Sequence, residues 1–321
     1  MFIRSIKEVV TYLTWEAKRY GNGCKKVYVS LSGGVDSAVV AMILVKAFGK
    51  ENVVAVYRDI RSNPEHEADA IILAKALGFQ LICLDLNPIY DAFLDNVQKQ
   101  FIENDLPWLK EGEQINGETW VNVYASLKSR MMTPFAGFIA KAVDGGNGRI
   151  YGTGNLEEDF LLRYYDKFGD GAVDNNILVG LTKMEVRQIA LWFGEKYNAP
   201  ICKKIAEKIP SADLQANGNM HNDENELTMI ARSYGFDIRL SYGTCTEEGN
   251  IAWICKQDLD LGVVRGRRAR WTDALQSKLG YTGEQVQLTM FMRKMEKATR
   301  HKALGIPGVT RPQLRKACLV D

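Results

Sequence analysis

The stretch YVSLSGGVDSAVVAMIL, residues 28–44, contains the tight connection between two apolar runs on which the fold prediction depends. An apolar run stops at Ser32, two glycines follow, and a second apolar run begins around Asp36 and Ser37. This pattern predicts a strand, a tight loop and a helix. Such a loop offers free backbone N–H groups and the positive end of a helix to an anion, and glycine lets phosphate oxygens approach closely. The alternative is an ordinary turn in which Ser or Asp caps the helix.

Asp36 indicates what kind of phosphate site this loop would be. A carboxylate repels phosphate, so its position is explained if a Mg²⁺ ion bridges the two. Ser32 and Ser37 would add hydroxyl donors. The loop lacks the Gly-Lys-Ser/Thr ending of a Walker loop and the GxGxxG spacing of a dinucleotide-binding loop. The stretch therefore predicts a nucleotide that is held together with a metal ion.

Strand-like and helix-like segments alternate through the first half of the chain. Helices are expected at 2–20, 36–48 and 64–77, and strands at 27–31, 52–57, 80–86 and 150–152. This alternation predicts a doubly wound α/β fold, in which a mainly parallel sheet carries helices on both faces. Ligands of such folds bind at the carboxyl ends of the strands, and the Ser32 loop lies at such an end.

The second half of the chain is less regular. Helices are expected at 184–197 and 283–300, a polar and turn-rich segment at 211–226, and little periodicity at 236–270. The last of these segments ends in a basic run, Arg265, Arg267, Arg268 and Arg270. The tail from Gly305 is expected to be extended, because prolines and glycines interrupt it. We expect one domain over 1–321, with an N-terminal helical segment at 1–23.

Composition excludes several classes of protein. A net charge of +2 gives no general reason to expect nucleic acid or a membrane as partner. No apolar run approaches the roughly 20 residues that a membrane span needs. The six cysteines form no CxxC pair, which favours reduced thiols in a cytosol-like compartment, and three histidines do not support a usual zinc site. We therefore expect a soluble, cytoplasmic protein.

Further polar motifs follow the strand that ends near residue 152. They are found in YGTGNLEEDFLLRYYDKFGDGAVDNNILVGLTK (151–183), PSADL (210–214), NDENEL (222–227) and RHK (300–302). Glu158 could complete a Mg²⁺ site with Asp36. Lys183 and Lys302 could pair with phosphates. Ser211 could donate a hydrogen bond to a transferring acyl or phosphoryl oxygen.

Residues 32–37, SGGVDS, resemble the SGGxDS loop of the ATP pyrophosphatase, or PP-loop, enzymes. The order of the later motifs, GT, KFGDG, LTK, PSADL, DENEL and HK, is similar to that of the NAD synthetase family, which amidates deamido-NAD. This resemblance covers residues 30–302. It implies an adenine nucleotide alpha hydrolase-like fold, ATP as a substrate, Mg²⁺, and an acyl-adenylate that ammonia converts to the amide. It further implies release of AMP and pyrophosphate, and a homodimer to which residues 2–20 could contribute.

The resemblance assigns roles residue by residue. It implies ATP contacts for Ser30, Ser32, Gly33, Gly34, Asp36, Ser37, Arg130 and Thr153. It implies a metal site at Asp36 and Glu158, and catalytic roles for Asp36, Asp170, Lys183 and Ser211. It implies substrate contacts for Asp170, Asp174, Lys183, His301 and Lys302. Because Asp170 is flanked by glycines, an aspartate that merely stabilises a turn is a rival interpretation of that residue.

The second metal ligand depends on the motif from which residues are counted. Counting forward from Gly152 selects Glu158, whereas counting back from Lys167 selects Asp159, because one extra residue separates the two motifs in this chain. Either residue supplies a carboxylate. Glu157, taken alone, is expected on the solvated surface.

Two other segments depart from the family pattern. The family's N-x-x-A-R-x-R helix is best matched by SLKSRMM, residues 126–132, which keeps Arg130 but has Ser126 in place of Asn. Sliding the match places Asn122 correctly and loses the arginine. Residues 236–270 resemble an insertion that the short bacterial-type enzymes lack.

The nitrogen source and two rival functions also follow from the sequence. Only about 30 residues precede the SGGVDS loop, where glutamine-dependent NAD synthetases carry a nitrilase-like domain, so free ammonia is the expected donor. One rival is another PP-loop enzyme that acts on a different substrate such as tRNA, for which the arginine run would offer phosphate contacts. A solvated face is the commoner role of such a run. The other rival is a nucleotide-binding protein without catalysis.

Overall fold

The computed structural model describes residues 3–108, 123–211, 222–266, 272–303 and 308–321. Within these residues, strands pair in the order β3-β2-β1-β4-β5, and every pairing is parallel. The strands are β1 (Val27–Ser30), β2 (Val53–Asp59), β3 (Gln80–Asp85), β4 (Arg149–Gly152) and β5 (Asn175–Asn176). The predicted parallel sheet is therefore confirmed.

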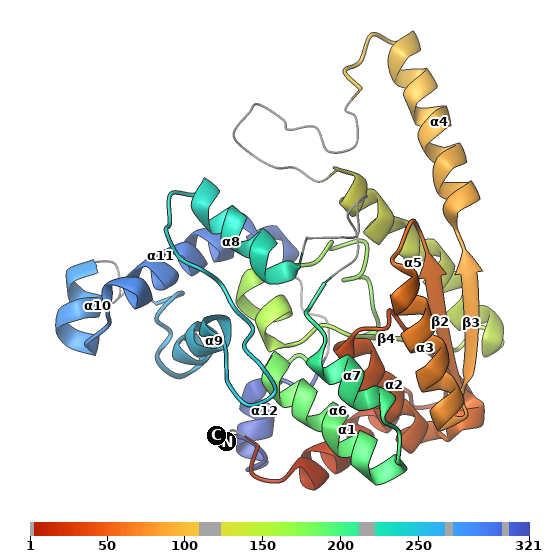
Figure 1. The fold of residues 1–321 in the computed structure, drawn as a ribbon, viewed down its shortest axis with the longest axis horizontal. Coiled ribbons are helices and arrows are strands. Elements are labelled where there is room, and N and C mark those ends of the chain that lie inside the picture. Colours follow the sequence, from red (N-terminus) through yellow and green to blue (C-terminus); the bar gives the residue numbers. More distant parts are fainter. Residues whose placement is uncertain (1–2, 109–122, 212–221, 267–271, 304–307) are drawn as a thin grey trace.

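Helices cover both faces of this sheet (Figure 1). One face packs against α1 (Ile6–Tyr20), α2 (Val35–Phe48), α3 (Pro64–Leu77), α6 (Lys183–Tyr197) and α7 (Ile201–Glu207). The other face packs against α5 (Val123–Val143). Val27 and Val29 belong to the first core, whereas Tyr28 between them belongs to the second. Successive strand residues point to opposite faces, so a strand buried on both sides is an uninterrupted apolar run.

Local signals set several helix ends where the sequence predicts them. The side chain of Asn63 accepts a hydrogen bond from the Glu65 N–H at 3.0 Å and caps α3, and Pro64 occupies the first turn. Thr182 and Glu185 form a reciprocal capping box at the start of α6. Each cap satisfies backbone N–H groups that have no partner inside the helix.

The N-terminal helix is part of the core of its own chain. The apolar residues of α1 that the sequence identifies, among them Val9, Val10 and Leu13, are buried against α2 and α6. That apolar face is therefore occupied within the monomer. The two termini lie side by side, where Ile3 forms an antiparallel bridge with Val320 (Figure 1).

The tail contains a helix, so the prediction of an extended tail is wrong over its last part. α12 (Arg311–Lys316) begins with a capping box between Thr310 and Gln313, and Leu314 is fully buried. Proline favours the first turn of a helix as readily as an extended chain, and Pro312 stands in that turn. Gly305 itself lies outside the described residues.

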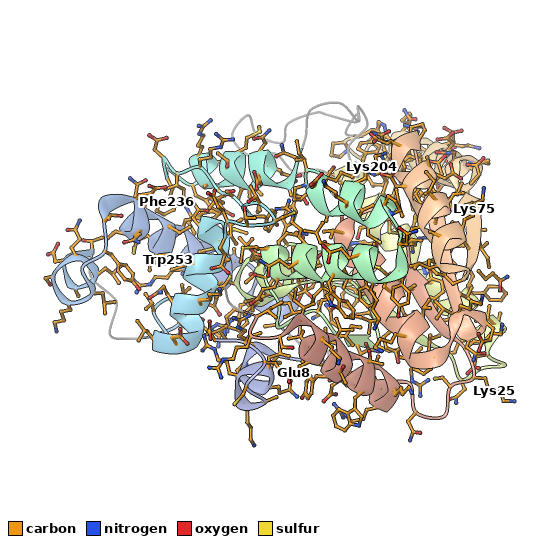
Figure 2. The ribbon with its side chains drawn as sticks, turned by 60° about the horizontal axis from the view of Figure 1, so that its bottom comes forward. Glu8, Lys25, Lys75, Lys204, Phe236 and Trp253 are labelled. Atoms are coloured by element: carbon orange, nitrogen blue, oxygen red, sulfur yellow. The ribbon has the colours of Figure 1, made fainter. Side chains whose placement is uncertain are left out.

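A second apolar core joins three further helices to the segment after β4. These helices are α8 (Asp223–Ser233), α9 (Asn250–Leu261) and α11 (Gly283–Ala298). α10 (Thr272–Leu279) packs through Leu275 into a separate, smaller cluster, and the short turns η1 (Lys50–Asn52) and η4 (Arg300–Lys302) lie elsewhere. The π-helical turn η2 (Glu157–Leu162) contributes Leu161 and Leu162 to the second core. Phe236 packs against Phe291 of α11 with ring centroids 5.9 Å apart. Figure 2 labels Phe236 among these helices.

The segment 236–270, for which little periodicity is expected, contains the helix α9. Its buried residues Ile251, Ile254 and Cys255 are spaced at i, i+3 and i+4, which is the apolar face of a helix, and they pack with η2 and α11 in the second core. The stripe is difficult to recognise in the sequence because Ala252 and Trp253 make residues 251–255 a continuous apolar run. The hypothesis that this segment is an insertion remains a prediction.

The basic run makes contacts within the chain where it is described. The guanidinium of Arg265 lies 4.2 Å from the centroid of the Phe160 ring and 3.6 Å from the Asp258 carboxylate. Arg267, Arg268 and Arg270 lie outside the described residues. Arg265 therefore acts as a packing residue.

α4 (Asn87–Glu103) projects away from the rest of the molecule (Figure 1). Of its side chains only Tyr90 is buried, and Ile89, Phe93 and Ile102 are exposed. Neither α4 nor any other helix in the described ranges has the length and apolar character needed to cross a membrane.

Candidate active site

The strand order places a crevice between β1 and β4, because the chain builds the sheet outward from β1 in one direction and then continues on its other side. From β1 the chain adds β2 and β3 on one side, and β4 and β5 lie on the other. Ligands of open α/β sheets bind where the strand order reverses in this way, beyond the carboxyl ends of the strands. The loops that follow β1 and β4 meet there and line a cavity of about 430 Å³.

The Ser32 loop is held in shape by its own hydroxyl groups. The Ser37 hydroxyl accepts a hydrogen bond from the Ser32 N–H at 3.1 Å and donates to the Gly34 carbonyl at 3.0 Å. Gly33 has φ +77°, and a Cβ there would lie 2.3 Å from the His66 carbonyl oxygen, so only glycine fits. α2 starts directly after this loop, and its positive end faces the cavity.

One lysine bridges two carboxylates that are far apart in the sequence. The Lys183 Nζ lies 2.6 Å from Asp36 Oδ2 and 2.6 Å from Glu158 Oε1. The lysine side chain is 3% exposed, and the carboxylates are 16% and 18% exposed. Burial lowers the pKa of Lys183, but the two carboxylates outweigh burial and hold it above its ordinary value, so the ammonium stays charged. Burial raises the pKa of Glu158, and the ammonium opposes that rise.

The three consecutive acids after β4 point in three directions. Glu158 faces the cavity, whereas Asp159 accepts a hydrogen bond from the Asn176 amide and does not line the cavity. Glu157 is fully buried, and its Oε2 accepts a hydrogen bond from the Lys183 N–H. The expectation that Glu157 lies on the solvated surface is therefore wrong. Burial raises the pKa of Glu157 to about 8, which favours the neutral form near neutral pH.

Asn155, which the sequence analysis did not single out, connects this acidic segment to the Ser32 loop. Its amide nitrogen donates to Asp36 Oδ1 at 3.0 Å, and its amide oxygen accepts from the N–H groups of Glu157 and Glu158. The sequence signal that could have identified Asn155 is its position just before a helical turn, because asparagine is a favoured helix cap.

Asp170 combines a turn role with a place at the cavity. Its Oδ1 accepts hydrogen bonds from the Ser129 hydroxyl at 2.6 Å and from the Asp166 N–H at 2.9 Å. The carboxyl also lines the cavity, whose walls desolvate it and thereby raise the pKa of Asp170. The rival turn interpretation therefore describes hydrogen bonds that are present, and it does not remove Asp170 from the cavity.

Most of the predicted site residues line the cavity. They are Ser30, Ser32, Gly34, Asp36, Ser37, Thr153, Glu158, Asp170, Lys183, Ser211 and Lys302. The Lys302 ammonium donates to the carbonyl oxygens of Arg163 at 3.0 Å and Tyr165 at 2.5 Å. Burial lowers the pKa of Lys302. The C-terminal motif is thus tied to the segment that joins η2 to the Asp170 turn.

Four predicted residues are not among those that line the cavity: Gly33, Arg130, Asp174 and His301. Arg130 is exposed on α5 and pairs with Asp166 at 2.9 Å. Asp174 accepts a hydrogen bond from the Ile150 N–H at 2.7 Å at the other end of β4. Conversely, two cations that no motif identifies, Arg58 and Lys128, do line the cavity.

The donor set fits a metal ion that arrives with a nucleotide. Over the part of the chain that the structure describes, no group of three or more His, Cys, Asp or Glu side chains could hold a metal by itself. Mg²⁺ typically binds one or two carboxylates together with waters and substrate phosphates. Asp36 and Glu158, which converge on one point beside the Ser32 loop, match that requirement.

Comparison with known proteins gives consistent matches. The family model described as NAD synthase matches residues 5–234. An NH₃-dependent NAD⁺ synthetase from Finegoldia magna is 31% identical over 204 residues, which is 64% of this chain and 72% of the relative. One from Trichlorobacter lovleyi is 35% identical over 211 residues, which is 65% of this chain and 66% of the relative.

A solved structure extends the likeness beyond the part that the family model matches. An NMN synthetase from Francisella tularensis superposes with a TM-score of 0.62 over 93% of this chain and 95% of its own, at 22% identity. At that identity the likeness concerns the fold. It includes the helical C-terminal part.

Proposed function

The chain belongs to the NAD synthase family, and from this premise we propose that it is a ligase that amidates deamido-NAD with ammonia and consumes ATP. Its products would be NAD, AMP and pyrophosphate. The observation that carries this proposal is the meeting of Asp36, Glu158 and Lys183 at one point beside the Ser32 loop. A loop for phosphates, two carboxylates for a metal and one lysine are what an adenylation needs.

The first step forms an acyl-adenylate. A carboxylate oxygen of deamido-NAD attacks the α-phosphorus of ATP, the bond from that phosphorus to the bridging oxygen breaks, and pyrophosphate leaves. The N–H groups of the Ser32 loop and the start of α2 would hold the pyrophosphate. Asp36 and Glu158 would hold Mg²⁺, which neutralises developing negative charge when bound. Lys183 would then be free to contact a phosphate.

The second step exchanges AMP for nitrogen. The lone pair of ammonia attacks the acyl carbon, the carbon–oxygen bond to AMP breaks, and the nitrogen loses a proton. Asp170 lies at the cavity, where it could accept a proton from ammonium. Ser211 also lines the cavity and could donate a hydrogen bond to the acyl oxygen.

We also propose that the protein is a homodimer. The exposed apolar residues of α4 support an interface there, since isolated helices with so little burial are marginal in water. Sedimentation should give twice the chain mass of 36.1 kDa. A mass of 36.1 kDa at micromolar concentration would contradict this part of the proposal.

The acid substrate has a second candidate. The neighbour named NMN synthetase shares the fold over nearly the full length of both chains, including residues after 234 that the family model does not reach. The mononucleotide acid, deamido-NMN, is therefore the second compound to test. An enzyme for the dinucleotide should turn over deamido-NAD with the higher kcat/KM.

The test is a product balance. Deamido-NAD, ATP, Mg²⁺ and ammonium should give amide and AMP in equal amounts, and omission of ammonium should stop amide formation. Formation of ADP would contradict the proposed reaction. Stimulation of ATP cleavage by added RNA, without turnover of either pyridine acid, would favour the tRNA alternative. ATP binding without pyrophosphate release would favour the non-catalytic one.

A further inference from the structure

The side chain of Asn155 links two segments that lie 119 residues apart. It is 0% exposed, donates to Asp36 Oδ1 at 3.0 Å, and accepts from the N–H groups of Glu157 at 3.0 Å and Glu158 at 3.1 Å. The orientation of the amide follows from chemistry: backbone N–H groups only donate and an ionised carboxylate only accepts, so the oxygen must face η2 and the nitrogen must face Asp36.

These bonds restrict both carboxylates of the cluster. Asn155 holds one oxygen of Asp36, so the other oxygen is the one that faces Lys183. The amide oxygen meanwhile fixes the first N–H groups of η2, from which the Glu158 side chain extends to the same lysine. One buried side chain thus sets the position of Asp36 relative to Glu158.

We propose that Asn155 is a positioning residue that holds Asp36 and Glu158 in the arrangement in which they share one cation with bound ATP. This inference rests on the proposed function. Asn155 does not itself line the cavity, so it acts through the two carboxylates. Residues that orient metal ligands typically change metal affinity or activity by about 10–100-fold when they are replaced.

A simple helix cap is the competing explanation, and the two explanations differ in what they require. Asp and Ser cap helices about as well as Asn. A cap alone would therefore tolerate Asn155→Asp and Asn155→Ser. Positioning of Asp36 requires a donor that reaches its carboxylate. Asp supplies no donor and adds a like charge, whereas Ser is too short to replace the amide nitrogen.

The experiment measures equilibrium binding of Mn²⁺ in the presence of α,β-methylene ATP, for the full-length protein and both variants, together with thermal melts. Asn155→Ser should raise the Kd for Mn²⁺ about tenfold and Asn155→Asp about a hundredfold. The KM for ATP should rise in parallel, while the KM for the acid substrate should stay constant. Excess Mn²⁺ should restore analogue binding. Asn155→Ser adds no charge, so it serves if the Asp variant does not fold.

Asn176→Ser is the matched control. Asn176 also donates its amide to a carboxylate of the same turn, that of Asp159, which does not line the cavity. This variant should lower the melting temperature and leave the Kd for Mn²⁺ within about twofold. Unchanged Mn²⁺ binding in both Asn155 variants, or an equal loss in Asn176→Ser, would overturn the inference about Asn155. Failure of the unmodified protein to bind the Mn²⁺ analogue complex would instead overturn the proposed function.

Discussion

The first turn of α6 carries two ion-pair clusters that differ in composition and in access to solvent. Lys183 meets two carboxylates, Asp36 and Glu158, that are partly exposed to the cavity. Two residues further on, Glu185 meets the single guanidinium of Arg311, which lies 2.7 and 2.6 Å from its two oxygens. Both of these side chains are 0% exposed.

The difference separates the proposed binding cluster from a packing cluster. In the first cluster two carboxylates outnumber one ammonium, and the cluster borders the cavity, where the proposed function adds a further cation. In the second cluster the charge of one carboxylate is matched by one guanidinium, and both side chains are buried, so a further ion has no access to them. The closed pair links α12 to the start of α6. In the proposed function, the open cluster is the one that changes its partners when the ligand binds.

The largest expected effect breaks the closed pair. Arg311→Met would leave the Glu185 carboxylate buried without a cation, which should lower the free energy of unfolding by about 3–5 kcal/mol. Urea denaturation measures this change. Turnover per folded molecule should fall only a few-fold, since neither residue lines the cavity. Arg311→Met combined with Glu185→Gln should recover part of the lost stability. An unchanged midpoint for the single variant would contradict the assignment of this pair to packing.

The next effect concerns the open cluster. Asp36→Asn keeps the shape of the side chain and removes one carboxylate charge, so AMP formation should fall by about 10²–10³-fold. The melting temperature should change little, because the carboxylate is partly exposed. Asp260→Asn is the control, since Asp260 pairs with Arg315 outside the cavity and away from α4. Activity of Asp36→Asn within threefold of the unmodified protein would mean that the cluster is not part of the site.

Lys183→Met tests the comparison of the two clusters more closely, because it removes the ammonium that lies between Asp36 and Glu158. Without the ammonium, Asp36 and Glu158 should bind Mn²⁺ in the absence of nucleotide about tenfold more tightly, which is about 1.4 kcal/mol. AMP formation should fall in the same variant. Mn²⁺ is titrated into the protein at pH 8, because burial raises the pKa of Glu158 and the ammonium that opposes this rise is gone in the variant. Equal or weaker Mn²⁺ binding would show that the lysine does not occupy the place of a cation.

The smallest effect is expected at Arg130. Its ion pair with Asp166 is exposed and contributes at most about 1 kcal/mol, and often nothing measurable. Arg130→Ala should therefore leave the melting temperature almost unchanged and the KM for ATP within about twofold. A tenfold rise in that KM would instead support the ATP contact that the family resemblance implies for Arg130.

Several parts of the fold and site could be predicted because their signals are local. The Ser32 corner, the Asn63 cap and the Thr182 start of α6 depend on residues within one turn of each other. Other parts depend on long-range packing. Arg130 stands on a predicted helix, but the rotation of α5 against the sheet decides whether it faces the cavity.

The acidic triplet illustrates the same limit at the site. A count of residues cannot choose between Glu158 and Asp159, since consecutive helical side chains point in different directions. η2 packs into the second core, and this packing turns Glu157 inward, Glu158 toward Lys183 and Asp159 toward Asn176. That core is built from α8, α9 and α11, which follow the triplet in the chain by 60 residues or more.

The sequence by itself determined the parallel α/β class, the phosphate-loop corner and the order of motifs that identifies the family, because these depend on short-range patterns of apolar residues, glycines and caps. Only the tertiary structure decided which carboxylate meets Asp36, that a lysine lies between them, and that Asn155 holds them together. Residues 36, 155, 158 and 183 come from different loops and helices. Their distances follow from where the strands end and how the helices pack, which no local pattern encodes.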